Sequence, residues 1–337
     1  MPSWRAAGLA GDATLEIRRQ FRCDDLVGRS PEFARVLREA AQVAPLPITV
    51  LITGPTGTGK SALARAIASN SARASGPYVD LNCAAIPEAL LESELFGAEA
   101  GAYTGAVRRM PGKVAAARGG TLFLDEVADL SLAAQAKLLQ LLQDRRYYPL
   151  GATTPVTADV RVISATNKDL KALAATRAFR ADLYYRLAVM PIRLPGLEER
   201  RDDIPALVER CCAESCERLQ IEHLRPTRRA LWACREAPWP GHVRELANVA
   251  EAGVARAVFE RAKVVDEHHL FPSSPRSADA PPTFREATLR SQRRHLEEAL
   301  TRNDWNVTWA AADLDLSRQH VHDLISTFSL RRPGDGT

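Results

Sequence analysis

Hydrophobic positions alternate between two patterns along the first two thirds of the chain. Short, β-branched runs predict strands, and the longer stretches between them, apolar at every third or fourth position, predict helices. Strands are expected at residues 48–53, 78–82, 121–125, 160–165 and 190–194. Each is short and mostly apolar, as strands of a parallel sheet covered on both faces are. The region from about Asp24 to Pro195 is therefore predicted to be an α/β domain.

After the break at Leu194-Pro195-Gly196 the expected strands stop and only helices follow. Helices are expected at residues 203–217, 227–236 and 243–259, which predicts a smaller helical domain. Residues 271–283 are rich in Pro, Ser and Ala without periodicity, which is typical of a linker. Three more helices are expected at residues 283–301, 307–314 and 317–328, with Ser317 as the N-cap of the last.

Composition sets few limits on function. With 337 residues, 46% hydrophobic and 26% charged, the chain has the profile of a soluble protein of two or three domains. A net charge of +4 mildly favours an acidic partner, and allows nucleic acid without indicating it. The start of the chain has no apolar core of a signal peptide, and no run approaches the roughly 18 apolar residues of a membrane span. We therefore expect a cytoplasmic protein without a membrane partner.

The six cysteines do not form a recognisable metal or disulfide pattern, because paired CxxC spacing is missing. Cys211, Cys212 and Cys216 could be imagined as metal ligands. They fall, however, in an amphipathic helical stretch, where packed thiols are the more common reading. We expect reduced cysteines and no metal cluster there.

A glycine-rich loop, GPTGTGKS, stands between an expected strand and an expected helix. This is the context that a phosphate-binding P-loop requires, and the alternative is a chance match in a glycine turn. In a P-loop the backbone N–H groups and the helix N-terminus hold the phosphates. Lys60 is expected to reach the β- and γ-phosphates, and the Ser61 hydroxyl to hold Mg²⁺. The expected nucleotide-binding residues are Gly54, Gly57, Thr58, Gly59, Lys60 and Ser61.

Phosphoryl transfer also needs carboxylates, and Asp125 and Glu126 follow the apolar run TLFL. Asp125 is expected on the magnesium side, and Glu126 is placed to polarise the attacking water. Taken alone, the same pair could be a helix N-cap with an acid in the first turn. ATP is favoured over GTP, because the nearest guanine-reading motif, NKDL at residues 167–170, has leucine where aspartate is required.

The segments ESELFG (residues 92–97) and GAYTGA narrow the class of ATPase. The second closely resembles the GAFTGA loop of the sigma-54-dependent activators, also called bacterial enhancer-binding proteins, with Tyr103 in place of the usual phenylalanine. The resemblance implies that this loop contacts sigma-54 and moves with the state of the nucleotide. The alternative is a surface β-hairpin with glycines at its turns. The implied contact residues are Gly101, Ala102, Tyr103, Thr104, Gly105 and Ala106.

The resemblance runs from about residue 22 to 330 and implies further roles. Asn167 matches the sensor I asparagine near the γ-phosphate, and Asn82 matches the residue that restrains the catalytic glutamate. Arg180 and Arg186 match arginine fingers that enter the neighbouring subunit, and Arg244 matches sensor II in the helical lid. Without the family the asparagines would pass as strand-end polar residues. Either arginine could equally form a local salt bridge.

The three C-terminal helices suggest a helix-turn-helix, and the family carries a Fis-like DNA-binding domain in this place. Recognition would fall to Arg318, Gln319, His320 and His322. From Thr283 onward the sequence contains eight arginines and eight acidic residues, so its net charge is near zero and strong nonspecific binding to phosphates is not indicated. A dimerisation bundle without DNA binding therefore stays open as an alternative.

The expected fold class is a P-loop AAA+ α/β domain, with a parallel sheet flanked by helices, followed by an α-helical lid and an all-α helix-turn-helix domain. The expected boundaries are a tail at 1–21, the α/β subdomain at 22–195, the lid at 196–271, a linker at 272–283 and the DNA-binding domain at 284–337. The tail is too short for a sensory domain.

The implied function is ATP-dependent activation of sigma-54 RNA polymerase holoenzyme. The implied cofactors are ATP and Mg²⁺, and the implied partners are the holoenzyme, double-stranded enhancer DNA and further copies of the chain, from a dimer to a hexameric ring. Two alternatives remain: an AAA+ remodeller of another protein client, and a DNA-binding regulator whose ATPase is vestigial.

Overall fold

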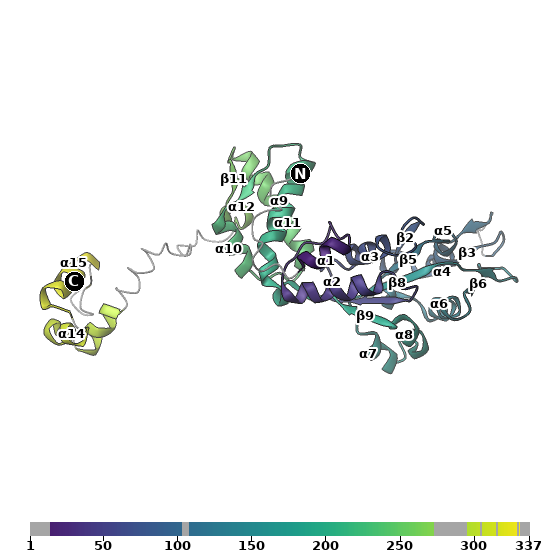
Figure 1. Cartoon of the computed structure of the whole chain (residues 1–337), viewed down its shortest axis with the longest axis horizontal. Coiled ribbons are helices and arrows are strands. Elements are labelled where there is room, and N and C mark those ends of the chain that lie inside the picture. Colours follow the sequence, from purple (N-terminus) through teal and green to yellow (C-terminus); the bar gives the residue numbers. More distant parts are fainter. Residues whose placement is uncertain are drawn as a thin grey trace. The chain divides into compact units, whose positions relative to one another are not determined.

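The structure is a computed structural model, and it describes residues 14–102, 108–272, 295–303, 305–314, 316–328 and 330. The chain forms two compact units, residues 1–272 and 273–337, which are described separately (Figure 1). The first unit contains the α/β domain and the helices that follow it. The second contains the C-terminal helices.

A parallel sheet of five strands is the centre of the first unit. Its order is β2-β5-β8-β1-β9, and every neighbouring pair is parallel. All five strands predicted from the sequence are present, with small shifts at their ends. They are β1 (Val50–Thr53), β2 (Tyr78–Asn82), β5 (Thr121–Asp125), β8 (Arg161–Thr166) and β9 (Met190–Arg193).

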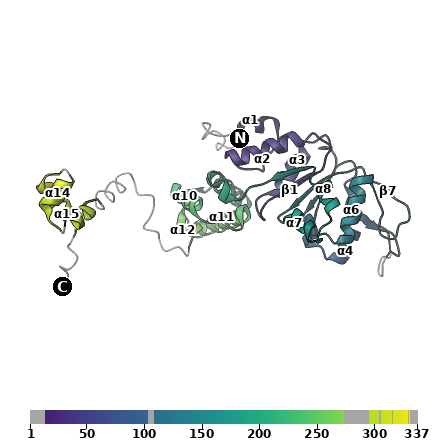
Figure 2. The same cartoon turned by 90° about the horizontal axis from the view of Figure 1, so that it is seen from below.

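Helices cover both faces of the sheet, as the apolar strands require (Figure 2). On one face α2 (Pro31–Val43) and α3 (Lys60–Ser69) pack over Val50 and Ile52. On the other, α4 (Glu88–Phe96), α6 (Leu132–Asp144) and α8 (Ala181–Leu187) pack over Leu51. Successive residues of β1 thus serve two separate hydrophobic cores. The smaller helices of this part are α1 (Leu15–Gln20), α5 (Lys113–Ala116) and α7 (Leu170–Ala175).

Two short hairpins lie at the end of the α/β domain away from the later helices (Figure 1). One pairs β3 (Gly97–Ala98) with β4 (Met110–Pro111), and the other pairs β6 (Arg146–Tyr147) with β7 (Val156–Thr157). Leu150 joins them, because its N–H donates to Gly97 O and its carbonyl accepts from Glu99 N, both at 2.9 Å. The two hairpins therefore form one connected element.

The lid has its own core. It consists of α9 (Ile204–Arg218), α10 (Arg228–Glu236), α11 (His242–Phe259) and α12 (Glu267–Leu270), with a short ladder of β10 (Arg225–Pro226) and β11 (Val264–Val265). The three expected helices are confirmed. Cys211, Cys212 and Cys216 are buried in this core as free thiols, and burial raises the pKa of Cys212 to about 12. At neutral pH this thiol is uncharged and packs as a small apolar side chain.

Buried polar residues at the start of the lid tie it to the α/β domain. The carboxylate of Asp203 accepts hydrogen bonds from Arg29 N at 2.7 Å, from Ser30 N at 2.8 Å and from Ser30 Oγ at 2.8 Å. Arg200 donates from Nη2 to Thr58 O at 2.9 Å, and its guanidinium lies 4.9 Å from the ring centre of Phe33. The lid is thereby fixed to the glycine loop and to the start of α2.

The C-terminal unit contains a helix at residues 295–302, α14 (Val307–Asp313) and α15 (Arg318–Phe328). Leu296, Leu300, Ala310 and Val321 are buried between them. Ser317 Oγ accepts from His320 N at 3.2 Å, which confirms Ser317 as the N-cap of α15. The last two helices of the prediction are confirmed. Of the first, predicted at residues 283–301, the structure describes only residues 295–301, and the rest of that prediction lies outside the described residues.

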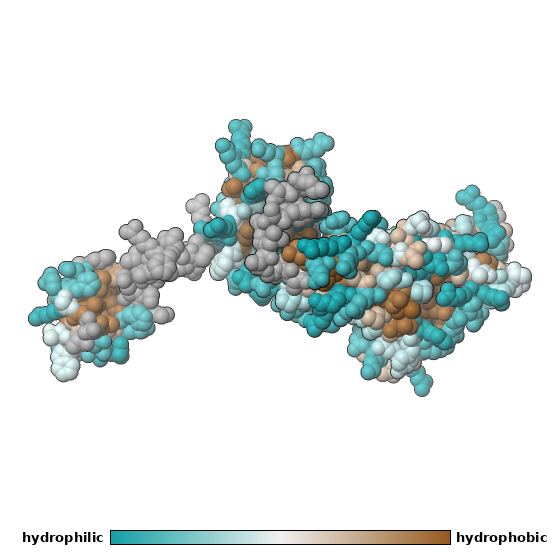
Figure 3. Space-filling model, viewed as in Figure 1, coloured by the Kyte–Doolittle hydropathy of each residue, from teal (hydrophilic) through white to brown (hydrophobic). Residues whose placement is uncertain are grey.

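Hydrophilic side chains cover most of the face shown in Figure 3, and hydrophobic residues are interspersed among them. Over the described residues, no helix combines the length and the apolar character needed to cross a membrane.

Replacing Asp203 by alanine tests the link between the lid and the α/β domain. The side chain is fully buried, so Asp203→Ala leaves three donors without an acceptor. We expect the free energy of unfolding to fall by about 2–4 kcal/mol, measured by urea denaturation. Asp202→Ala is the matched control. Its side chain is 70% exposed and pairs with Arg235 on the surface, so the expected change is below about 0.5 kcal/mol. Equal effects of the two substitutions would contradict this account.

Candidate active site

The glycine loop connects β1 to α3 at the carboxyl edge of the sheet. Gly57 has φ +82°, and a Cβ there would lie 2.4 Å from Gly241 O of the lid, so only glycine fits. Gly59 has φ +104° and directly precedes α3; a Cβ there would meet nothing within 4 Å. The loop thus forms an open cradle next to the helix N-terminus, where phosphate oxygens can approach the backbone.

Lys60 is held inside this loop. Its side chain is 6% exposed, and Nζ donates to Gly54 O at 3.0 Å and to Pro55 O at 3.3 Å. The same ammonium lies 3.5 Å from Glu126 Oε1. Thr58 closes the loop from within, since its hydroxyl donates to Pro55 O at 2.8 Å. The loop therefore positions one cation between the phosphate cradle and the acidic pair.

Asp125 ends β5 beside the start of α3, and Ser61 Oγ donates to Asp125 Oδ2 at 3.3 Å. Hydroxyl and carboxylate oxygens are hard ligands of the kind that Mg²⁺ prefers, and two at this separation would suit one ion. Mg²⁺ usually keeps water molecules as its other ligands. The residues present therefore fit the expected metal. Bound there, Mg²⁺ would neutralise charge on the phosphates.

The acidic pair lies in a partly desolvated environment. Burial, followed by the charge of Glu126, raises the pKa of Asp125 above its usual range, although Lys60 and the Ser61 hydrogen bond act in the opposite direction. Burial and the nearby carboxylates, Asp125 foremost, likewise raise the pKa of Cys83 to about 12. A divalent cation would relieve this concentration of negative charge.

Glu126 and Asn167 meet at the same edge. Glu126 has φ +51°, and its Oε2 accepts from Asn167 N at 3.0 Å. Asn167 Nδ2 donates to Thr56 Oγ1 at 2.8 Å, which places the predicted sensor asparagine against the glycine loop. Glu126 is the residue before a short 3₁₀ helix (Val127–Asp129) and makes no side-chain capping bond. Asp125, the N-cap of the alternative interpretation, accepts from Glu126 N at 3.1 Å.

Asn82 ends β2 next to β5, paired in register with Asp125. Its side-chain oxygen accepts from Ala84 N at 3.0 Å, so in this conformation it caps the following turn. The Glu126 carboxylate is held instead by Lys60 and by Asn167 N. The structure places Asn82 near the acidic pair without joining it to Glu126, and its role as a restraint on that residue stays a prediction.

Arg244 lies in the first turn of α11, as the sequence predicted. Its N–H donates to Gly57 O at 3.2 Å, while its side chain is exposed. The lid therefore touches the phosphate loop directly through the backbone of this residue.

The predicted arginine fingers both belong to the α8 region. Arg180 forms two hydrogen bonds with Asp182, of which Nη2 to Oδ2 is 2.7 Å. Both side chains are more than 40% exposed, so this pair contributes little to stability and can separate at little cost. Arg186 is exposed, and its carbonyl accepts from Thr49 Oγ1 at 2.8 Å. Thr49 precedes β1, so Arg186 lies at the amino edge of the sheet, opposite the glycine loop.

Of the predicted sigma-54 contact loop, Gly101 and Ala102 are described, and Tyr103 to Ala106 lie outside the described residues. Gly101 has φ +82°, and Ala102 N donates to Glu99 O at 3.2 Å. This segment leaves the hairpin base at Gly97–Ala98. The GAYTGA sequence thus belongs to the chain segment that connects β3 to β4.

Comparison with known proteins agrees with this geometry. Residues 26–193 match the model of the sigma-54 interaction domain, and residues 198–286 match that of an AAA+ ATPase lid domain. The transcriptional regulatory protein GlrR of Escherichia coli (strain K12) is 41% identical over 305 residues, which are 90% of this chain and 68% of GlrR. The chain belongs to the sigma-54 activator family.

One more relative and two solved structures are similar to this chain. The regulator NtrC of Rhizobium meliloti is 45% identical over 72% of this chain and 51% of its own length, so the chain spans about half of that relative. The crystal structure of NtrX from Brucella abortus in complex with ADP superposes with a TM-score of 0.68 at 32% identity, covering 90% of this chain and 70% of NtrX. The RuvB motor of Thermotoga maritima shares the fold alone, with a TM-score of 0.51 at 13% identity over 95% of this chain and 94% of RuvB. This sigma-54 activator is therefore a P-loop ATPase.

The predicted DNA-reading residues lie on α15 of the C-terminal unit. Arg318, Gln319 and His320 are exposed in its first turn, and Gln319 Nε2 lies 3.5 Å from Asp323 Oδ1. His322 belongs to the same helix, but its side chain lies outside the described part. The exposed first turn is the part of a recognition helix that contacts base edges in helix-turn-helix proteins.

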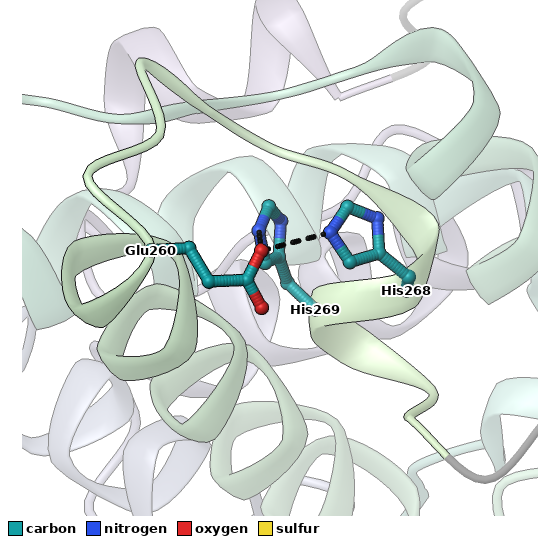
Figure 4. A group of neighbouring side chains, drawn as sticks. All are labelled: Glu260, His268 and His269. Atoms are coloured by element: carbon teal, nitrogen blue, oxygen red, sulfur yellow. Dashed lines mark hydrogen bonds and ion pairs between the residues drawn. The ribbon is translucent and has the colours of Figure 1, made fainter.

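One cluster of potential metal ligands lies in the lid, formed by Glu260, His268 and His269 (Figure 4). Both His Nε2 atoms lie 3.2 Å from Glu260 Oε2. His269 Nδ1, however, accepts from Asp266 N at 2.8 Å, so in the neutral ring Nε2 carries the proton and donates to Glu260. A metal-bound histidine has the opposite arrangement. We therefore assign His269 to capping of α12, with Glu260 as the acceptor of its second ring nitrogen.

Sequence reasoning missed three residues of the site, namely Thr56, Arg200 and Asp203. Thr56 lies in the glycine-rich loop but was not among the expected nucleotide-binding residues, yet its hydroxyl accepts from the sensor asparagine. Arg200 and Asp203 fall in the charged run ERRDD, which resembles a solvated surface. The run directly follows the Pro-Gly break, and that position at a domain junction was the available signal.

Replacing Asp125 by asparagine separates function from stability. We expect Asp125→Asn to lower the ATPase rate by about 10²-fold or more, because Mg²⁺ loses its carboxylate ligand. We expect no loss in melting temperature, because burial and the charge of Glu126 raise the pKa of Asp125, so that its charged form is less favourable in the folded protein than in the unfolded chain. Phosphate release and thermal unfolding measure the two effects. Asp129→Asn, on the same turn, is the control for loss of a nearby charge, and a large fall in melting temperature for Asp125→Asn alone would contradict the argument.

Proposed function

We propose that this sigma-54 activator hydrolyses ATP in an oligomeric ring and uses the Gly101–Ala106 loop to remodel the closed promoter complex of sigma-54 RNA polymerase holoenzyme. The observation that carries the proposal is the presence in one chain of Lys60, Asp125, Glu126 and Asn167 around the glycine loop and of GAYTGA in the connection between β3 and β4. ATP is the substrate, and the protein would act in the cytoplasm, where polymerase works.

Each residue of the site would have its own role in the hydrolysis of ATP. In the proposed reaction a water oxygen attacks the γ-phosphorus, the bond to the β–γ bridging oxygen breaks, and Glu126 takes the proton of the attacking water. Lys60 and the loop N–H groups stabilise charge on the phosphate oxygens. Asn167 contacts both Glu126 and the loop residue Thr56, which suits a reporter of the γ-phosphate. Asn82, one strand away, would restrain Glu126 in other states of the ring.

The position of Arg186 supports the proposal that hydrolysis needs an oligomeric ring. It lies at the amino edge of β1, whereas the glycine loop lies at the carboxyl edge, so the two belong to opposite ends of the sheet. An arginine that acts on the γ-phosphate would therefore come from the neighbouring subunit. Arg180 would join it after releasing Asp182, and Arg244 would follow the nucleotide from the lid. Hydrolysis then depends on assembly.

The remaining parts complete the proposal. We assign residues 22–195 to the α/β subdomain, 196–271 to the lid, 272–283 to a linker and 284–337 to a Fis-like helix-turn-helix domain that binds upstream DNA. The bond network of Leu150 supports the two hairpins acting together as the element that grips sigma-54.

The deciding experiment is ATP-dependent open-complex formation by purified sigma-54 holoenzyme on a sigma-54 promoter. A high concentration of activator bypasses enhancer binding, and Lys60→Ala is the control. We expect opening with the wild type and none with the variant. Hydrolysis without opening would point to another client, and loss of both under assembling conditions would favour a regulator that only binds DNA.

Mixing two inactive variants tests whether Arg186 acts in the nucleotide site of the neighbouring subunit. A subunit with Arg186→Ala keeps an intact nucleotide site, and a subunit with Lys60→Ala keeps an intact Arg186. In a mixed ring about a quarter of the head-to-tail interfaces should combine both, restoring a comparable share of the ATPase rate. Mixing Lys60→Ala with Asp125→Asn is the control, because both changes lie in one cradle and no interface regains a complete site. Equal rates for the two mixtures would refute a finger in trans.

Substitution of Arg318 tests the recognition helix. We expect Arg318→Ala to weaken binding to the cognate upstream site by about 1–3 kcal/mol, because it removes a base contact from the exposed first turn of α15. Fluorescence anisotropy at fixed salt measures the change. Arg302→Ala is the matched control, because Arg302 lies outside this helix and pairs with Asp313 at 3.3 Å. If neither variant alters binding, Arg318 makes no base contact and its proposed role in recognition is refuted.

A further inference from the structure

Several arginines lie together at the amino edge of the sheet, at the opposite edge from the nucleotide cradle. A pocket of about 160 Å³ is bounded there by the segment before β1, the end of α6, the start of β8 and the end of α8. This volume is several times the roughly 30 Å³ that a water occupies in the liquid. Of the residues that the structure describes, four arginines and no carboxylate line it, and the arginines are Arg73, Arg145, Arg161 and Arg186.

Arg161 is the buried member of this set, with 4% of its surface exposed. Nη1 donates to Ala44 O at 2.6 Å and Nη2 to Val43 O at 2.9 Å, at the carboxyl end of α2. Its Nε is buried and has no hydrogen-bond partner. Burial and the charge of Arg73 lower the pKa of Arg161 below its usual range. The carbonyls and the helix dipole offset only part of the cost of burying this cation.

One neighbouring carboxylate, that of Asp159, is outside the pocket lining, although the charges of Arg73 and Arg145 both act on it. Asp159 is engaged by Arg73, at 2.5 Å from its Nη2, and Arg73 holds the pKa of that carboxyl below its usual range. Among the described residues, no ion-pair partner is found for the guanidinium of Arg145 or of Arg186. Several like charges around one pocket repel one another unless an anion lies between them.

From this geometry we infer that the pocket is a binding site for a small oxyanion of the phosphate class. A tetrahedral oxyanion fits the volume and accepts several charge-assisted hydrogen bonds at once, as guanidinium groups provide them. The exposed Arg145 and Arg186 are reachable from solvent, while Arg161 supplies a fixed positive charge at the inner wall.

The site has a consequence for Arg186. An anion bound here would hold this guanidinium within its own subunit, whereas the proposed function places it in the neighbouring one. Phosphate would then oppose hydrolysis by a route separate from the nucleotide cradle. This consequence rests on the proposed function, but binding of the anion does not.

Residue-resolved chemical labelling tests the binding directly. The full-length protein, without nucleotide, is treated with an arginine-selective dicarbonyl reagent, and mass spectrometry follows modification of Arg186 as inorganic phosphate is added. Chloride at equal ionic strength is the reference, and pyrophosphate shows whether a larger phosphate ligand is preferred. Within one subunit the glycine loop lies at the opposite edge of the sheet, and labelling at protein concentrations below ring assembly keeps a neighbour's loop away from Arg186.

Arg145→Asn and Arg146→Asn are the matched pair of variants. Arg145 has φ +54°, which asparagine tolerates well, so the substitution removes the charge without straining the turn. Arg146 is the adjacent exposed arginine and does not line the pocket. We expect phosphate to protect Arg186 in the wild type and in Arg146→Asn. In Arg145→Asn the concentration for half protection should rise roughly tenfold.

Either of two results would overturn the inference. One is equal protection by chloride and phosphate at the same ionic strength, which would mean general screening. The other is unchanged protection in Arg145→Asn, which would mean that the pocket does not hold the anion. Neither result bears on sigma-54 activation, which the open-complex experiment tests separately.

Discussion

The close approach of the lid to the glycine loop is the constraint on which the rest of the site depends. Gly57 lies against Gly241 with no space for a side chain, and Arg244 N donates to Gly57 O. Arg200 holds the next residue of the loop through Thr58 O. Any shift of the loop around phosphates must therefore move the lid, or strain these contacts. The nucleotide cradle and the lid act as one mechanical element.

The electrostatics of the cradle follow from its place in the fold. The carboxyl ends of β1, β5 and β8 meet at one edge, which brings Lys60, the adjacent Asp125 and Glu126, and Asn167 together from three separate segments. Partial burial strengthens every charge there, as the raised pKa of Asp125 shows. Such a site is costly with its own charges alone, and a cation with bound phosphates is the ligand set that balances it.

Arginines at the opposite edge complement this arrangement. The amino edge of the sheet carries Arg186 and the pocket that it shares with Arg161, while the acidic pair lies at the carboxyl edge. A head-to-tail ring brings the unlike edges of neighbouring subunits together. The same surface would therefore serve catalysis in the ring and bind a small anion in the free subunit, and the two uses would compete for one guanidinium.

The sequence by itself determined the elements and most of the chemistry. The strand, glycine loop and helix around Lys60 are local in the chain, and backbone preference and apolar spacing specify each of them without reference to the rest. Burial in two cores follows from the apolar strands, and the Ser317 cap from one side chain and the turn after it.

Only the tertiary structure decided which charges are buried and which residues meet. Asp202 and Asp203 are adjacent and chemically identical, yet one is 70% exposed and the other fully buried, because only the second faces the start of α2. Likewise Arg161 and Arg186 come from different segments and share a pocket only after the sheet has formed. Such contacts depend on packing between distant parts of the chain, and no local preference in the sequence encodes them.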